Sequence, residues 1–192
     1  MADYSPTYLN DQLFYRYEPE GTELFAVLDG ARSADIYHHL QLSSLEYESL
    51  FSGQLSPALR AASPFLVRLR PQDPFTNFLV EQGWGKSFGI YVAWRNGLSS
   101  LRRHLRTLLR VRAEKGRHLY FRFYDPRVLR VFLPTCSAEQ LRALLGNIRR
   151  LDLEALEGSQ LWRYRTSEDH EPKLLTWQHD LRSAHRMVGR DS

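Results

Sequence analysis

Short apolar runs recur along the chain and are separated by polar stretches with helical spacing. Most of these runs end at glycine, proline or aspartate, as buried strands do where they meet a turn. The candidate strands are residues 23–28, 65–69, 86–94, 118–124, 148–153 and 161–164. Because strands alternate with helices in this order, the pattern predicts an α/β class (mixed α+β), with one or more mixed sheets flanked by helices.

Capping residues mark where the helices begin. The candidate N-caps are Ser33, Asp73, Asp125 and Ser137. A proline follows each of the two aspartates, at the first helical position, where a proline is well tolerated. Ser137 and Gln140 have the spacing of a capping box. We therefore expect a helix after each cap, with the second ending at Gly83 and the last ending near Gly146.

The length of 192 residues fits one domain, which we expect to be two-lobed. Residues 1–22 predict an irregular, aromatic-rich leader, and residues 23–165 predict the main domain. Residues 166–192 predict a C-terminal amphipathic helix with Trp177 and Leu181 on its apolar stripe. This stripe either docks on the sheet or presents Trp177 and Leu181 to a partner, so both are candidate partner-binding residues.

Basic residues concentrate in the middle of the chain. Residues 101–150 hold thirteen arginines and lysines against three acids, whereas residues 1–50 hold two against nine. Leucines at helical spacing over residues 98–113 predict an amphipathic helix with an arginine face. The arginines expected on its exposed face, all candidate partner-binding residues, are Arg102, Arg103, Arg106 and Arg110. They either meet an acidic partner, pair with the acidic first quarter of the chain, or contact nucleic-acid phosphates without a recognised reading module.

No catalytic, metal-binding or cofactor-binding constellation stands out. The segment Gly85-Lys86-Ser87 has the ending of a phosphate-binding loop, but Val80 replaces the glycine that such a loop requires. The only cysteine is Cys136, and the histidines lack metal-binding spacing. We expect no enzyme activity, metal, cofactor or small-molecule substrate. The polar N-terminus and the short apolar runs predict neither an export signal nor a membrane span, which favours a soluble cytoplasmic protein.

Residues 118–129, HLYFRFYDPRVL, form the most distinctive stretch of the chain. The run is similar to the FRFYDPRVL signature of the bacterial type VI secretion adaptor-chaperone family, of the Tap/TEC type. Further pieces follow in the order of that family over about residues 23–150. They are LFAVLDGAR at 24–32, YESLFSG at 47–53, SPFLV at 63–67, GWG at 83–85, the arginine-rich helix and GNIRR at 146–150. The chain departs from the family at Leu144-Leu145, where an aromatic residue is usual, and at Asn147, where proline is common.

The resemblance implies a cytoplasmic, non-enzymatic adaptor. Such a protein binds a toxic effector and brings it to the VgrG spike protein before firing, and it needs no metal or nucleotide. The signature carries over only as a scaffold or partner-surface motif. Its residues here are Phe121, Arg122, Phe123, Tyr124, Asp125, Pro126 and Arg127. A protein-binding adaptor and a basic nucleic-acid-binding protein are therefore the two main hypotheses, with a hydrolase as a third.

Overall fold

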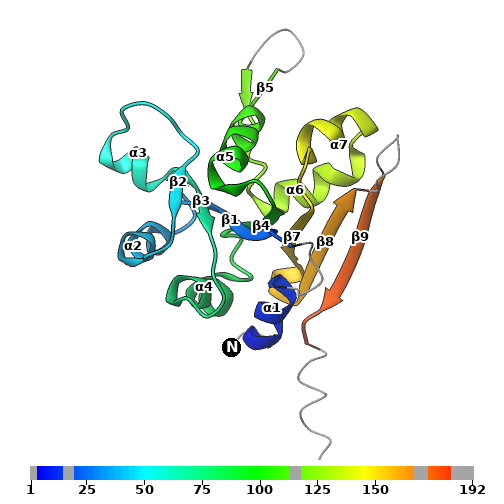
Figure 1. Ribbon diagram of the computed structural model, residues 1–192, viewed down its shortest axis with the longest axis horizontal. Coiled ribbons are helices and arrows are strands. Elements are labelled where there is room, and N and C mark those ends of the chain that lie inside the picture. The colour runs from blue at the N-terminus through cyan, green and yellow to red at the C-terminus, as the bar shows by residue number, and fades with distance from the viewer. Residues whose placement is uncertain (1–3, 15–19, 113–117, 167–172, 183–192) are drawn as a thin grey trace, which may run out of the picture.

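Every strand of the main sheet runs antiparallel to its neighbours. The computed structural model describes residues 4–14, 20–112, 118–166 and 173–182. One sheet has the strand order β2-β3-β1-β4-β7-β8-β9, and β5 and β6 form a separate two-stranded ribbon (Figure 1). The strands are β1 (Glu23–Asp29), β2 (Tyr47–Ser49), β3 (Pro64–Arg68), β4 (Gly89–Trp94), β5 (Arg110–Arg112), β6 (His118–Tyr120), β7 (Arg150–Ala155), β8 (Gln160–Thr166) and β9 (Leu174–Asp180).

A layer of helices covers each face of this sheet. The helices are α1 (Pro6–Leu13), α2 (Ala34–Leu42), α3 (Pro57–Ala61), α4 (Pro74–Phe78), α5 (Gly97–Leu108), α6 (Pro126–Phe132) and α7 (Ala138–Leu145). Phe25 and Val27 of β1 belong to one hydrophobic core, with residues of α5, α6 and α7. Leu24 and Leu28 belong to a second core, with residues of α1, α2 and α4. Figure 1 shows these two groups of helices on opposite sides of the sheet. Burial on both faces explains the continuous apolar run of β1.

The α/β class and the capped helix starts are confirmed. The side chains of Ser33, Asp73 and Asp125 each accept a hydrogen bond from the backbone N–H two residues later. Ser137 forms the predicted capping box. The helix that begins at Pro74 continues through one π-helical turn and ends at Gly83, as predicted.

The sheet is not the mixed sheet that the alternation of elements predicted. All of its neighbouring pairs are antiparallel, because alternation along the chain does not determine the direction in which the next strand returns. The arginine-rich helix was predicted through residue 113 but ends at Leu108, since Arg110–Arg112 pairs with β6. The strand predicted over residues 118–124 ends at Tyr120, and the chain then turns into α6.

Both ends of the chain also differ from the predictions. Residues 1–22 are not irregular throughout, because they contain α1, whose Leu9 and Leu13 are fully buried. The predicted C-terminal helix is wrong for residues 174–180, which form β9 and pair with β8 along their whole length. Pairing gives β8 backbone hydrogen bonds that a helix at this position would leave unmade, so tertiary context overrides the helical spacing. The rest of that predicted helix, at 167–172 and 183–192, lies outside the described residues.

A buried charge cluster fastens α1 to the sheet. Asp152 of β7 lies between two arginines, with its Oδ2 atom 2.9 Å from Arg150 Nε and its Oδ1 atom 2.8 Å from Arg163 Nε. Both guanidinium groups also donate hydrogen bonds to backbone carbonyls at the end of α1, those of Leu13 and Gln12. The last backbone carbonyls of a helix accept no hydrogen bond from a donor within the helix, and they attract positive charge. The two arginines satisfy both requirements.

Replacing Asp152 tests the weight of this cluster. Asp152→Asn removes the negative charge that lies between two buried guanidinium groups, and we expect a loss of about 3–5 kcal/mol in the free energy of unfolding, measured by urea denaturation. The matched control is Asp11→Asn, at an exposed position of α1, where we expect a change within about 0.5 kcal/mol. Equal stabilities of the two variants would contradict the structural role of the cluster.

The two candidate partner-binding residues in and just after β9, Trp177 and Leu181, provide a second matched pair. Leu181, just after the strand, is fully buried in the second core, whereas the side chain of Trp177 is 44% exposed. Leu181→Ala should therefore lower the free energy of unfolding by about 2–5 kcal/mol, and Trp177→Ala by much less. Thermal melts of both variants measure the difference. A larger loss of stability for Trp177→Ala than for Leu181→Ala would contradict the assignment of Leu181 to the core.

Candidate partner-binding surface

The arginines of α5 divide into two groups. Leu98, Leu101 and Leu105 turn the apolar side of the helix into the first core, as its spacing predicts. Arg103 and Arg106 are exposed on the other side, and Arg110 is exposed at the start of β5. The exposed positions predicted for these three arginines are confirmed.

Arg102 does not share that exposed face. Its Nε atom lies 2.9 Å from Glu48 Oε2 and donates a hydrogen bond to the carbonyl oxygen of Ser49, so the side chain is tied to β2. Here the acidic first quarter of the chain neutralises one arginine of the basic middle, as one of the three interpretations of the charge pattern expected. Arg102 is therefore not one of the freely exposed arginines, because it lies on the side of α5 that faces the edge strand β2.

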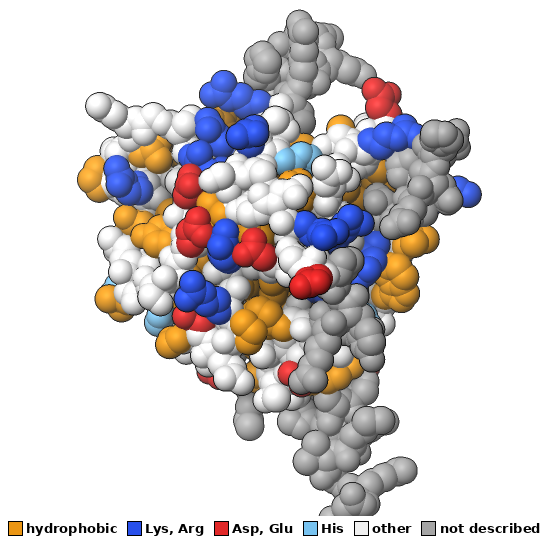
Figure 2. Space-filling model, in the orientation of Figure 1, with side chains coloured by type: hydrophobic (Ala, Val, Ile, Leu, Met, Phe, Trp, Pro, Cys, Tyr) orange, Lys and Arg blue, Asp and Glu red, His pale blue; other side chains and the backbone are white. Residues whose placement is uncertain are grey.

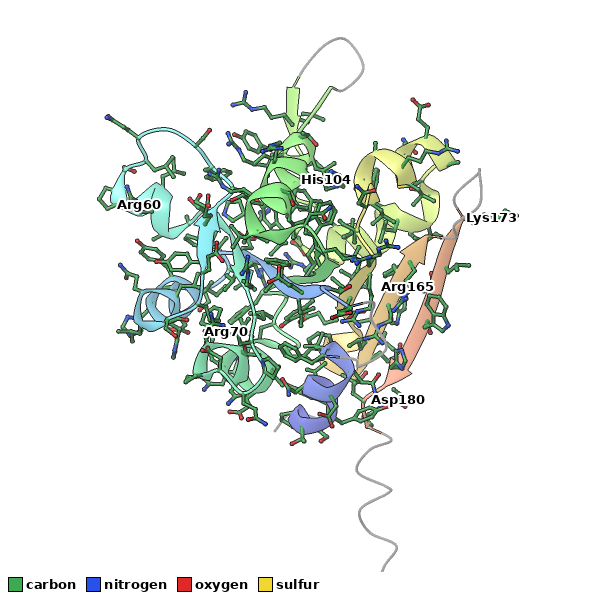
Figure 3. The ribbon with its side chains drawn as sticks, viewed as in Figure 1. Arg60, Arg70, His104, Arg165, Lys173 and Asp180 are labelled. Atoms are coloured by element: carbon green, nitrogen blue, oxygen red, sulfur yellow. The ribbon has the colours of Figure 1, made fainter. Side chains whose placement is uncertain are left out.

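A groove of about 790 Å³ lies between the end of α5 and the segment that follows β2. Its lining residues are Leu50, Phe51, Ser52, Leu55, Leu59, Arg103, Arg106, Thr107, Leu109, Arg110 and Tyr120. We call this the α5 groove. A second hollow of about 470 Å³ adjoins it and shares Phe51, Ser52, Leu55 and Arg106 with it. The second hollow also reaches Arg60, which Figure 3 labels on α3.

The α5 groove combines apolar and basic side chains, and no acidic side chain is among the described residues that line it. On the apolar side, the Phe51 and Tyr120 rings meet edge to face with their centroids 6.1 Å apart. On the basic side, no carboxylate of the described residues forms an ion pair with Arg103, Arg106 or Arg110. In Figure 2, basic side chains gather over α5 and acidic ones lie below them, toward the sheet. Such a surface suits an acidic partner with apolar side chains.

The FRFYDPR motif is a structural joint: it connects β6 to the start of α6, and two of its arginines are exposed. Phe123, Tyr124 and Pro126 are buried against the first core or beside it, and Phe121 packs half-buried on Phe132 of α6. Arg122 donates a hydrogen bond to Asp29 at the end of β1, which links the motif to the central strand. The burial of the central residues favours the scaffold interpretation of the motif, while Arg122 and Arg127 are exposed.

Asp125 carries out two tasks within that joint. It caps α6 by accepting from the N–H of Arg127 at 3.0 Å, and it forms an ion pair with the Arg127 side chain, with Oδ2 2.6 Å from Nη2. Burial alone raises the pKa of the Asp125 carboxyl, but the hydrogen bonds and charge of Arg127 outweigh it and hold the pKa below its ordinary value of 3.8. The ionised carboxylate is therefore the form that the fold stabilises.

A family model described as "Domain of unknown function (DUF4123)" matches residues 24–143. The chain belongs to the DUF4123 family. This family is associated with adaptor function in type VI secretion. No curated protein and no solved structure matches the chain. The matched region contains the α5 groove and the whole FRFYDPR motif, whereas β7, β8 and β9 lie beyond it.

In this DUF4123 protein, the segment Gly85-Lys86-Ser87 donates hydrogen bonds to a carboxylate of the same chain, that of Glu154. Glu154 of β7 accepts hydrogen bonds from the N–H groups of Gly85 and Ser87, both at 2.7 Å, and from the Ser87 hydroxyl. Burial raises the pKa of Glu154, and these hydrogen bonds partly oppose the rise. The backbone donors that would hold a phosphate are thus already used. No local pattern identifies Glu154, because it is 67 positions from Ser87 in the chain.

The structure separates Trp177 from the arginines. Trp177 lies on β9, at one edge of the sheet, whereas the α5 groove adjoins β2 at the other edge. Leu181 is a core residue, so its prediction as a partner contact is wrong; burial in the second core leaves it no surface to offer. Trp177 stays a candidate contact, now on a strand edge and not on a helix.

The described ranges bring together no cluster of three or more histidine, cysteine or acidic side chains suited to hold a metal ion. Among the helices of the same ranges, none is long and apolar enough to cross a lipid bilayer.

Variants of Asp125 separate its cap from its charge. Asp125→Ala removes both, and we expect a loss of about 0.5–2 kcal/mol in the free energy of unfolding. Asp125→Asn keeps a capping oxygen and should lose less. Because the folded state lowers the pKa of Asp125, the charge contributes fully above the ordinary value of 3.8 and is lost as the pH falls below it. The difference between the wild type and Asp125→Asn, followed by denaturation at several pH values, should therefore shrink in acid; a difference independent of pH would contradict this role.

Proposed function

We propose that this protein is a cytoplasmic, non-enzymatic adaptor that binds a toxic type VI secretion effector and delivers it to the VgrG spike protein. Membership of the DUF4123 family over residues 24–143 is the observation that carries the proposal. The structure supports it with an open groove whose lining contains residue types that are enriched in protein interfaces, namely arginine and aromatic residues.

An adaptor must hold two partners at once, and two separate surfaces of this protein suit that task. The α5 groove adjoins β2 at one edge of the sheet. At the other edge, β9 has a neighbouring strand on one side and exposes Leu175 and Trp177. Edge strands with exposed apolar side chains are common sites of strand addition by a partner. Partners bound at opposite edges would not compete for the same contacts.

Nucleic-acid binding is the competing function, and among the described residues of the groove Arg103, Arg106 and Arg110 support it. Arginines can contact phosphates and aromatic rings can stack on bases, but the leucines of the lining do neither. These leucines favour a polypeptide over a nucleic acid.

Co-expression tests the proposed function. The full chain, carrying a purification tag, is produced together with a type VI secretion toxin and a VgrG spike protein of the same organism and isolated at physiological salt after nuclease treatment. We expect the toxin and the spike to elute with the chain as one complex, and an unrelated secreted toxin, used as the control, to be absent. Elution of neither partner, together with tight binding of DNA or RNA at the same salt, would refute the adaptor function.

A further inference from the structure

Three arginines of the α5 groove differ from other arginines on the same side of the molecule. Arg68 forms ion pairs with Glu23 and Glu46, at 3.3 Å and 3.2 Å, and Arg102 pairs with Glu48. The acidic first quarter thus neutralises the arginines along the sheet edge. It does not reach the groove, where no described carboxylate pairs with Arg103, Arg106 or Arg110.

These arginines are arranged as one wall. Arg103 and Arg106 are three positions apart on α5, a spacing that brings side chains to the same side of a helix. Arg110 begins β5, where its residue partner across the ribbon is Tyr120. All three arginines line the α5 groove, so the basic wall continues from the helix onto the ribbon.

The groove also offers accessible apolar side chains. Leu59 of α3 is 46% exposed and Tyr120 is 60% exposed, although both side chains are largely hydrophobic. Phe51 and Leu55, both half-buried, also line the groove. Apolar groups in a concave surface gain free energy when a partner removes them from water.

We propose that the α5 groove receives an acidic segment of the effector protein, with large apolar side chains of that segment against Phe51, Leu59 and Tyr120. Its carboxylates face Arg103, Arg106 and Arg110, which have no such partner within the described chain. The inference rests on the proposed function, since it takes the effector as the partner. Charge complementarity favours an acidic segment, and the leucines of the lining, which neither contact phosphates nor stack on bases, favour a polypeptide over a nucleic acid.

Charge reversal in the full chain tests this inference. Arg103→Glu/Arg106→Glu should weaken effector binding at least about tenfold at physiological salt, and the binding that is left should depend less on salt concentration. The matched control is Arg70→Glu/Arg149→Glu, which reverses two exposed arginines outside both hollows; Figure 3 labels Arg70 near α4. The control should bind like the wild type. Calorimetric titration over a range of salt concentrations measures both effects.

The apolar side has its own matched pair. Leu59→Ser should weaken effector binding, whereas Leu42→Ser, at a 74% exposed position of α2, should not. Thermal melts of all variants check folding. If the double arginine variant does not fold, Arg106→Glu alone takes its place.

A cross-link identifies the bound segment. A photo-reactive residue in place of Leu59, in the chain complexed with the effector, should attach to a segment with net negative charge and at least two large apolar side chains. Attachment to a neutral or basic segment, to a second copy of this chain, or displacement of the effector by DNA would overturn the inference.

The two proposals fail in different ways. A wild-type chain that binds neither effector nor spike refutes the adaptor function. A wild-type chain that binds the effector, with groove variants that bind as tightly as their controls, refutes only the role of the α5 groove.

Discussion

The sheet is covered by helices on both of its faces, and this burial constrains the rest of the structure. A buried polar group that loses water must find a partner inside the protein, because an unsatisfied one costs several kcal/mol or changes its protonation. Three carboxylates at or within the central strands meet this requirement in three ways. Asp152 binds two arginines, Glu154 binds the backbone of residues 85–87, and Asp29 binds Arg122.

Each of these carboxylates fastens a different segment to the sheet. Through Arg150 and Arg163, Asp152 holds the end of α1. Through Arg122, Asp29 holds the FRFYDPR motif, so the most distinctive stretch of the chain is explained first as a joint between β1 and α6. The polar atoms that form these bonds are paired inside the fold. The surface that is left for partners must therefore come from elements outside this network.

The α5 groove is such a surface. Its helix buries Leu98, Leu101 and Leu105 in the first core, whereas Arg103 and Arg106 are exposed and form no ion pair with a described carboxylate. Its other side comes from residues between β2 and β3, which include the short helix α3. Two segments therefore form the groove. The core holds both in place, and side chains of both are left to line the groove. This arrangement is consistent with a DUF4123 protein that works by binding other proteins.

Local features of the sequence determined much of this protein. Caps at Ser33, Asp73, Asp125 and Ser137, the apolar runs of the central strands and the leucine stripe of α5 all depend on residues a few positions apart. Spacing along one element was therefore enough to predict them, together with the exposed arginines at 103, 106 and 110. Tertiary structure alone decided the pairings between distant segments. It paired β9 with β8 in place of a helix, tied Arg102 to Glu48, and put Glu154 into the loop at residues 85–87. These outcomes depend on which strand edges and charged side chains, distant in the sequence, meet once the chain has folded. The spacing of residues within one segment carries no information about such contacts.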